Sequence, residues 1–392
     1  MAVNLVEARQ DTPGVTNVLH FNNAGAALMP RPVTKSVVDH IQLEAEIGGY
    51  EAAERQHAKL EHAYAATARL LNCAPDEIAI VENATRAWDM AFYGFKFAAG
   101  DRILTAVAEY ASNFLSYLQV AKRTGCKIEV VPNDETGQLS LGALERMMDK
   151  RVKLISVTHV PTNGGLVNPA VGVGRIAKTW DVPFLLDACQ SVGQMPLDVE
   201  AIGCDALSAT SRKYLRGPRG IGFLYVRRSL LERLEPPMID LHAARWIATD
   251  RYELCRDARR FENWECNFAG KIGLGVAIDY ALAIGLDEIY ARVTTVSTLL
   301  RERLADIPRV AVRDVGAERC GIVTFTVEGR DPAEIKHVLA AKRVNVTTST
   351  RLSTRLDMEA RGLESIVRAS VHYYNSEEEV ERFVGEIRSI AA

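Results

Sequence analysis

A lysine at residue 213 stands where its amine could form a Schiff base with a carbonyl cofactor. Lys213 follows the apolar run "ALSATS" (206–211) and precedes the turn "GPRG" (217–220), after which a second apolar run begins. A lone lysine is usually solvated. Lys213 therefore becomes a candidate for covalent chemistry only if other segments carry groups that the same cofactor needs.

Two other segments carry groups of complementary chemistry. Asp187 ends the run "PFLLD", where a carboxylate could hold a proton on a buried ring nitrogen. The alternative is that Asp187 caps the next helix. Gln190, three residues on, could hydrogen-bond a ring substituent. "VENATRAW" places Ala84 and Thr85 at a strand-to-helix junction, where free N–H groups and the helix dipole favour an anion.

Thr210 and Arg212 lie beside Lys213 and could contact the same anion. A lysine, an acid for a pyridinium nitrogen and a phosphate cup are the groups that pyridoxal 5′-phosphate requires. Ligands of open α/β sheets lie beyond the carboxyl ends of the strands. The sequence therefore predicts a pyridoxal phosphate site at such an edge.

The elements around these residues alternate between strands and helices. Helices are expected at 34–47 and 51–71 from apolar residues at three- and four-residue spacings. Short apolar runs predict buried strands, among them "DEIAIVEN", "DRILTAVAEY", "CKIEVVPN", "RVKLISVTHV", "VPFLLDACQ", "ALSATS" and "GIGFLYV". This alternation predicts an α/β fold with a mostly parallel sheet covered on both faces.

The pattern changes past residue 270. A long helical stretch (270–306) precedes the alternating strand "GIVTFTVEG", a helix (332–342), a strand (344–348) and the strand "SIVRASVHYYN". Ser376 and Glu379 form a capping box for a last helix. We expect a large domain over 19–270 and a smaller α+β domain over 271–392 that also includes residues 1–18.

Composition restricts the classes of partner. The net charge of −3 over 392 residues gives no indication of nucleic acid or an anionic membrane. No apolar run reaches the roughly 18 residues of a membrane span. The seven cysteines include no Cys-x-x-Cys pair, which is typical of free thiols in a reducing cytoplasm. We expect a cytoplasmic protein with a small-molecule substrate and no metal site.

Several segments, in their order along the chain, resemble the class V aminotransferase family. They are "FNNAGAALMP", "HV-x-x-N-x-G", "DACQSVGQ-x-P-x-D", "CDAL-x-A-x-S-x-KYL-x-GPRGIGFLYV", "RFE" and "VRAS-x-x-YN-x-x-EEV". The family includes cysteine desulfurases, isopenicillin N epimerase-like proteins and several carbon–sulfur lyases. The resemblance implies a fold type I pyridoxal phosphate enzyme, usually a homodimer with active sites at the subunit interface.

The resemblance also implies roles for single residues. Lys213 is similar to the Schiff-base lysine, Asp187 to the partner of the pyridine nitrogen, and Gln190 to the neighbour of the ring hydroxyl. Phosphate-binding positions correspond to Ala84, Thr85, Thr210 and Arg212. Arg368, in "IVRAS", matches the arginine that grips the substrate carboxylate, and Gly25, in "FNNAGAA", lies in the loop near the substrate α-carbon.

Two positions depart from the desulfurase pattern. Ala111 stands where desulfurases have a ring-stacking histidine, so Tyr110 or Trp88 is expected to cover the ring, and we assign Tyr110. In "THVPTNGG", Thr162 or Asn163 takes the role of the usual asparagine. We assign Asn163 to the cofactor.

The reaction is inferred from the mobile loop before the final strand, where a desulfurase needs a cysteine thiolate. The corresponding stretch, 345–365, contains no cysteine. Cys320 is expected to be packed, and Cys189 is expected to point away from the cofactor if Asp187 and Gln190 point toward it. Persulfide-forming desulfuration is therefore disfavoured.

Loss of a leaving group from the β-carbon is then the simplest path. "RLDMEARGL" and "RFE-x-WE" look nearest to the epimerase-like and hercynylcysteine sulfoxide lyase-like branch. We expect β-elimination from a cysteine conjugate, which gives pyruvate and ammonia. The alternatives are an aminotransferase, an amino-acid racemase or epimerase, a desulfurase, and a non-enzymatic scaffold that binds pyridoxal phosphate.

Overall fold

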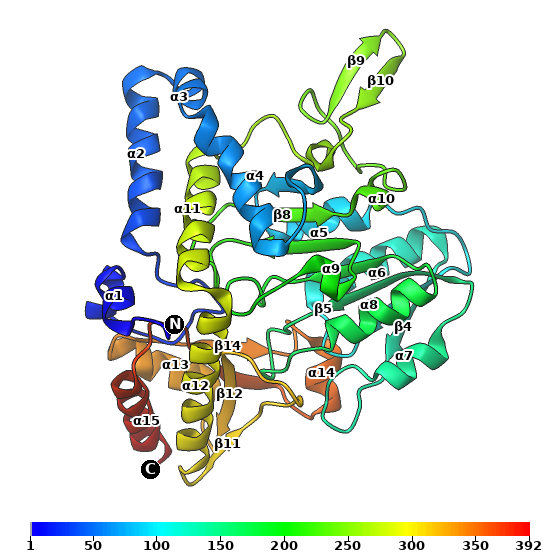
Figure 1. Cartoon of the computed structure of the whole chain (residues 1–392). Helices are drawn as coiled ribbons and strands as arrows, with labels where there is room; N and C mark the ends of the chain where they lie inside the picture. Colours follow the sequence, from blue (N-terminus) through cyan, green and yellow to red (C-terminus); the bar gives the residue numbers. More distant parts are fainter. Residues whose placement is uncertain (1) are drawn as a thin grey trace.

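The structure is a computed structural model that describes residues 2–392. Its largest element is a seven-stranded sheet of order β2-β8-β7-β6-β5-β3-β4 (Figure 1). Strand β8 runs antiparallel to both neighbours, and the other pairs are parallel. The strands are β2 (Ile78–Val81), β3 (Arg102–Ala106), β4 (Lys127–Val131), β5 (Val152–Thr158), β6 (Phe184–Asp187), β7 (Ala206–Thr210) and β8 (Gly222–Val226).

Successive residues of the central strands enter two hydrophobic clusters, one on each face of the sheet. In β6, Phe184 and Leu186 join one cluster and Leu185 joins the other. One cluster receives side chains from α5 (Ala84–Phe92) and α6 (Ala111–Thr124), and the other from α4 (His57–Leu71), α7 (Leu141–Met147), α8 (Ala170–Thr179), α9 (Val199–Ile202) and α11 (Phe268–Ile284). Burial on both faces explains the nearly continuous apolar runs. The predicted α/β fold with a mostly parallel sheet is confirmed.

A smaller antiparallel sheet of order β11-β12-β15-β14 has its own hydrophobic cluster. Its strands are β11 (Val310–Val312), β12 (Ile322–Val327), β14 (Thr347–Thr350) and β15 (Ser365–Ser370), and the helices beside it are α12 (Leu286–Ala305), α13 (Pro332–Ala341) and α15 (Glu377–Ala391). Ser376 and Glu379 form the predicted capping box of α15. The domain boundary at 270 stays a prediction. Helix α11, which begins near that boundary, packs on α2 (Arg31–Ile47) and α4 of the large domain.

The N-terminal segment lies against this smaller sheet. Strand β1 (Leu19–His20) pairs in parallel with β13 (Val344–Asn345). Arg9, in α1 (Leu5–Gln10), forms an ion pair of 2.9 Å with Glu379. Both contacts join the start of the chain to its last third.

The stretch predicted as one helix over 270–306 is two helices, α11 and α12, bent by 78°. Gly285 separates them with φ +96°, a conformation that favours glycine. Within residues 2–392, no single helix is long and apolar enough to cross a membrane. The bent pair α11 and α12 reaches that length and apolar composition only when the two helices are taken together. The helix predicted at 51–71 is likewise divided, into α3 (Gly49–Arg55) and α4.

The elements that the sequence did not predict include a hairpin and a short helix. A hairpin of β9 (Ala244–Ala248) and β10 (Arg251–Leu254) projects from the body of the molecule (Figure 1). Helix α14 (Arg355–Ala360) interrupts the segment predicted as a loop before β15. The remaining short elements are α10 (Arg228–Leu231) and the 3₁₀ turns η1 (Pro13–Thr16), η2 (Pro75–Glu77) and η3 (Ala258–Phe261).

Candidate functional site

The carboxyl ends of β2, β5, β6 and β7 lie along one edge of the large sheet. The register pairs Thr158 with Asp187, and Gly222 with both Val81 and Thr210. A cavity of about 160 Å³ lies at this edge. Among the predicted site residues, its lining includes Ala84, Thr85, Tyr110, Asp187, Gln190, Thr210, Arg212 and Lys213. The structure therefore brings together groups from four separate segments of the chain.

The N-terminus of α5 forms one wall of this cavity. Asn83 caps the helix, because its Oδ1 accepts a hydrogen bond of 2.9 Å from the N–H of Arg86. The N–H groups of Ala84 and Thr85, in the first turn, have no intrahelical acceptor. They can therefore bind an anion such as phosphate.

Gly222 lets this helix end approach the sheet closely. A Cβ at position 222 would lie 2.6 Å from the carbonyl oxygen of Ala209 and 2.8 Å from the carbonyl carbon of Asn83. A larger residue would therefore separate α5 from β7. The close approach keeps Ala84 and Thr85 beside Thr210 at the wall of the cavity.

Lys213 lies in the turn after β7 and extends into the cavity. Its pKa is lowered, chiefly because burial disfavours the ammonium form and also because Arg212 and Arg368 are nearby. A lowered pKa increases the fraction of neutral amine, the form that attacks a carbonyl or accepts a proton. The environment of Lys213 therefore suits both tasks.

Asp187 faces the same cavity from the end of β6 and is 6% exposed. Its Oδ1 accepts from the N–H of Cys189 at 2.9 Å, and its Oδ2 accepts from Nδ2 of Asn113 at 2.9 Å. Burial raises the pKa of Asp187, while these hydrogen bonds and the charge of Lys213 oppose that rise. No regular helix begins at the turn after Asp187, so it is not the helix cap that the sequence left open.

Gln190 provides a test of whether the cavity fits pyridoxal phosphate. Its Nε2 donates to the carbonyl of Ala24 at 3.2 Å, whereas its Oε1 is buried and has no hydrogen-bond partner among residues 2–392. Buried polar atoms are normally paired. An unpaired acceptor here suits a hydroxyl on a ligand ring. With the lysine, the acid and the anion site, the residues fit the cofactor.

The segment around Gly25 lies next to Arg212. The Nη1 of Arg212 donates to the carbonyl of Gly25, and the N–H of Ala27 donates to the carbonyl of Arg212 at 3.0 Å. Gly25 is thus brought to the site through its backbone, although it does not itself line the cavity.

Arg368 approaches the site from β15 of the smaller sheet and is 7% exposed. Its Nη1 donates to the side-chain oxygen of Thr162, a residue that lines the cavity. Its Nε is buried without a partner in the described chain. Burial lowers the pKa of Arg368 to about 10, so it remains charged at neutral pH. A buried guanidinium with a free N–H is suited to a carboxylate.

Replacement of Arg368 by Gln should raise the KM for an amino-acid substrate by about 100-fold, because a charged hydrogen bond to its carboxylate is lost. Steady-state kinetics measure this change. Arg351→Gln, at an exposed arginine near the same sheet, is the control and should leave KM within about twofold. An unchanged KM in Arg368→Gln would remove Arg368 from the substrate site.

Two expectations need correction. Asn163 does not line the cavity: its amide donates to Thr354 at 2.7 Å and accepts from Ser349, and Thr162 faces the cavity instead. Cys189 lines the cavity rather than pointing away. The strand ends at Asp187 and the chain turns back on it, because the N–H of Cys189 donates to Oδ1 of Asp187 at 2.9 Å. Cys189 therefore stays beside Asp187 at the cavity.

The aromatic cover for the ring was assigned to Tyr110, with Trp88 as the alternative. Trp88 is 1% exposed and stacks on Phe92 with ring centroids 4.5 Å apart, so it belongs to the core. Tyr110 lines the cavity and is 37% exposed, which leaves it as the available aromatic side chain.

Sequence reasoning missed Asn113 and Thr158, which also line the cavity, and named Thr162 only as the alternative to Asn163. It also missed Glu109, a buried acid behind it. Glu109 precedes Tyr110, the N-cap of α6, and Asn113 lies in the first turn of that helix. No helix-face pattern therefore marked the two residues in the sequence.

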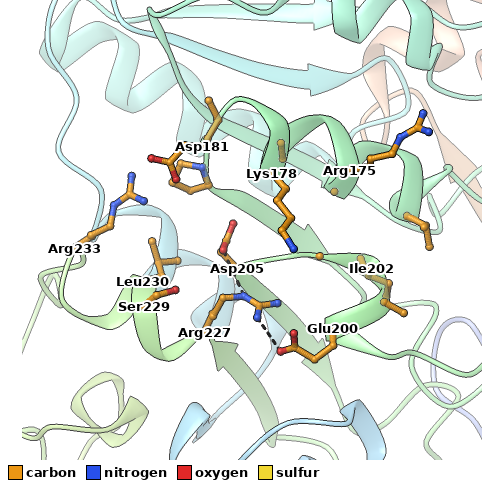
Figure 2. Close-up of a pocket in the computed structure, with 17 residues that line it drawn as sticks. Arg175, Lys178, Asp181, Glu200, Ile202, Asp205, Arg227, Ser229, Leu230 and Arg233 are labelled. Atoms are coloured by element: carbon orange, nitrogen blue, oxygen red, sulfur yellow. Dashed lines mark hydrogen bonds and ion pairs between the residues drawn. The ribbon is translucent and has the colours of Figure 1, made fainter.

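A larger cavity of about 460 Å³ lies at the opposite ends of β6 and β7. Figure 2 shows Arg227 between Glu200 and Asp205, and the ion pair with Glu200 measures 2.8 Å. Lys178 and Asp181 add further charges of opposite sign. This cavity lacks a buried unpaired polar group and lies away from Lys213, so its size does not make it the active site.

Comparison with known proteins agrees with the geometry. A probable cysteine desulfurase of Pyrococcus abyssi is 30% identical over 391 residues, covering 98% of this chain and 97% of the relative. The apo structure of a cysteine desulfurase from Thermococcus onnurineus NA1 has a TM-score of 0.92 at 28% identity and covers 100% and 98% of the two chains.

A third similarity concerns the fold. C-DES, in a variant solved with glycine covalently linked to its pyridoxal phosphate, has a TM-score of 0.88 at 23% identity and covers 97% and 98% of the two chains. Residues 19–383 match the family described as Aminotransferase class-V, which confirms the predicted family. The chain therefore belongs to the class V aminotransferase family, and it is an enzyme whose cofactor is pyridoxal 5′-phosphate.

Proposed function

We propose that this enzyme breaks the carbon–sulfur bond of cysteine or a cysteine-derived amino acid by β-elimination. The observation that carries the proposal is the arrangement of Lys213 in the cavity and Arg368 against its wall at Thr162, together with a loop, 345–365, that has no thiol. The desulfurase names of the relatives support a cysteine-type substrate. A narrower choice, a cysteine conjugate, rests on the sequence alone.

When bound, the cofactor withdraws electrons from the substrate α-carbon and so acidifies its proton. Arg368 orients the substrate by its carboxylate. The neutral amine of Lys213 is suited to accept the α-proton, because its pKa is lowered by burial and by the neighbouring arginines. Asp187 holds the proton on the ring nitrogen through a carboxylate fixed by Asn113.

The elimination balances without an oxidant or a reductant. The Cα–H and Cβ–S bonds break, and the sulfur leaves with the electron pair of its bond. The proton taken by Lys213 is available to the leaving sulfur. The released aminoacrylate reacts with water to give pyruvate and ammonia.

The loop before β15 supports this route over desulfuration. It is joined to the rim of the cavity, because the N–H of Ala111 donates to the carbonyl of Ser353 at 2.9 Å and Asn163 contacts Ser349 and Thr354. None of the residues in 345–365 can form a persulfide. Cys320, the nearest thiol in sequence, is fully buried, as expected.

Desulfuration through Cys189 is the second candidate. Cys189 lines the cavity beside Lys213. In that reaction, cysteine and the Cys189 thiol would give alanine and a Cys189 persulfide, which also balances. Burial raises the pKa of Cys189, so the thiolate that attack requires is disfavoured. The names of the relatives favour this second route, and the pKa of its thiol favours the first.

Product analysis separates the reactions. We expect pyruvate and ammonia in equal amounts from L-cysteine, L-cystine or an S-alkyl cysteine, and turnover by Cys189→Ala within about fivefold of the parent. Cys320→Ala is the matched control at a buried thiol away from the cavity. Alanine with a persulfide on Cys189, and loss of turnover in Cys189→Ala, would establish desulfuration. A keto acid that retains sulfur would indicate transamination. A D-amino acid as product would indicate racemisation.

We also propose that the enzyme is a homodimer. The hairpin β9–β10 supports this, because Trp246 and its cross-strand partner Tyr252 are 75% and 50% exposed. Exposed aromatic pairs on a projecting element are typical of a covered surface. Sedimentation equilibrium distinguishes one 43.2 kDa chain from two. A cytoplasmic location stays a proposal from cysteine usage.

A further inference from the structure

A buried acid behind the cavity has no role in the reaction described above. Glu109 lies between β3 and α6 and is 3% exposed. Its carboxylate accepts from Oγ1 of Thr105 at 2.9 Å, from the N–H of Thr158 at 3.1 Å and from the N–H of Tyr110 at 3.0 Å. The hydroxyl of Thr158 and the amide of Asn113 also donate to it. Since these partners are donors, they suit an ionised carboxylate.

Asn113 connects Glu109 to Asp187, the acid assigned to the ring nitrogen of the cofactor. Its Nδ2 donates to Oε1 of Glu109 at 2.9 Å and to Oδ2 of Asp187 at 2.9 Å, and the residue is 2% exposed. Ionised carboxylates only accept hydrogen bonds, so the amide nitrogen must face both acids. Rotation of the Asn113 amide would break both contacts at once.

We propose that Glu109 is a positioning residue that acts through Asn113 on Asp187. It fixes the direction of the Asp187 carboxylate and places a second negative charge behind it. The ring nitrogen of the cofactor consequently keeps its proton to higher pH than Asp187 alone would allow. Glu109 also fixes the backbone of Tyr110, at the rim of the same cavity.

The surrounding charges are consistent with this role. Burial raises the pKa of Glu109 to about 7, hydrogen bonds from Thr158 and Asn113 oppose that rise, and the charge of Asp187 adds to it. The titratable or charged groups near the two acids are Tyr117 on α6, Arg355 on α14, and Lys213, Cys189 and Arg212 at the cavity. Lys213, Arg212 and Arg355 are the basic groups among these. Glu109 lies on the Asn113 side of Asp187, so its charge adds to that of Asp187.

The proposal is tested by ¹⁵N NMR of the enzyme loaded with ring-¹⁵N-labelled pyridoxal phosphate. Glu109→Gln removes the charge, so the ring nitrogen should lose its proton at a pH about one unit lower than in the parent. The cofactor dissociation constant should rise about tenfold. Neither measurement depends on which substrate is used, so failure here is distinct from failure of the proposed reaction.

Asn113→Ala keeps the test decisive if Glu109→Gln folds poorly. It leaves Glu109 bonded to Thr105 and Thr158 but removes the amide that joins Glu109 to Asp187. The midpoint pH at which the ring nitrogen loses its proton should fall, as in Glu109→Gln. Glu129→Gln is the control: it removes a carboxylate on β4 that pairs with Arg102, far from Asp187 in sequence and sheet order, and should not move the midpoint.

A double-mutant comparison shows whether Glu109 acts through Asp187. In an Asp187→Asn background, Glu109→Gln should change the cofactor dissociation constant by less than about twofold, because the receiving carboxylate is gone. The full tenfold change in that background would overturn the proposal. An unchanged midpoint in both Glu109→Gln and Asn113→Ala would also overturn it.

Discussion

Replacement of Lys213 by Ala should lower turnover by about 10⁴-fold and remove the absorbance of lysine-bound cofactor. Lys213 lies in the cavity formed at the strand ends, and its lowered pKa suits both the covalent bond and the proton transfer. No other lysine lines that cavity, in the part of the chain that the structure describes, so its loss cannot be compensated locally. Stopped-flow assays and cofactor spectra measure the two effects.

Lys178→Ala is the matched control for this experiment. Lys178 is exposed on α8 and lines the other cavity, at the opposite ends of the strands. It should retain normal turnover and the normal spectrum. A Lys213→Ala enzyme that kept the lysine-bound absorbance would show that another amine holds the cofactor.

Asp187→Asn should lower turnover by about 10³-fold while some cofactor remains bound. The single carbonyl oxygen of the new amide can keep one of the hydrogen bonds that Cys189 and Asn113 donate to Asp187. An amide cannot stabilise a pyridinium charge as a carboxylate does. The activity assay should be accompanied by a cofactor titration, which separates lost chemistry from lost binding.

Asp181→Asn provides the control, because Asp181 precedes the same strand, β6, and is exposed at its other end. It should behave as the parent in both measurements. Near-normal turnover in Asp187→Asn would mean that Asp187 only shapes the turn at the end of β6.

The sequence predicted the strand ends of the site because two local rules agree there. Buried parallel strands are apolar on both faces, so a polar residue at their carboxyl end, such as Asp187, stands out from the run before it. The same rules give no information on how the strand ends lie relative to one another. Their convergence on one cavity depends on register and strand order, which come from the packing of the whole sheet.

The sequence could not decide which of two adjacent loop residues faces the site. Thr162 and Asn163 are adjacent, and the turn after β5 decides which of them faces Arg368. Cys189 was placed on the wrong side because it lies between Asp187 and Gln190 in sequence, whereas the turn after β6 brings all three residues to the cavity. Glu109 carried no strand-end signal of its own, and its importance depends on contacts with Thr158 and Asn113 that form only in the fold.

The location of Arg368 has a consequence for how binding is lost. The cofactor groups belong to the large parallel sheet, whereas Arg368 stands on β15 of the smaller sheet, whose hydrophobic cluster is separate. Local opening of the smaller sheet would withdraw the guanidinium and leave the lysine, acid and anion site assembled. Mild denaturant or heat would then weaken affinity for the amino acid before it weakens affinity for pyridoxal phosphate. The two affinities report the stability of different parts of one chain.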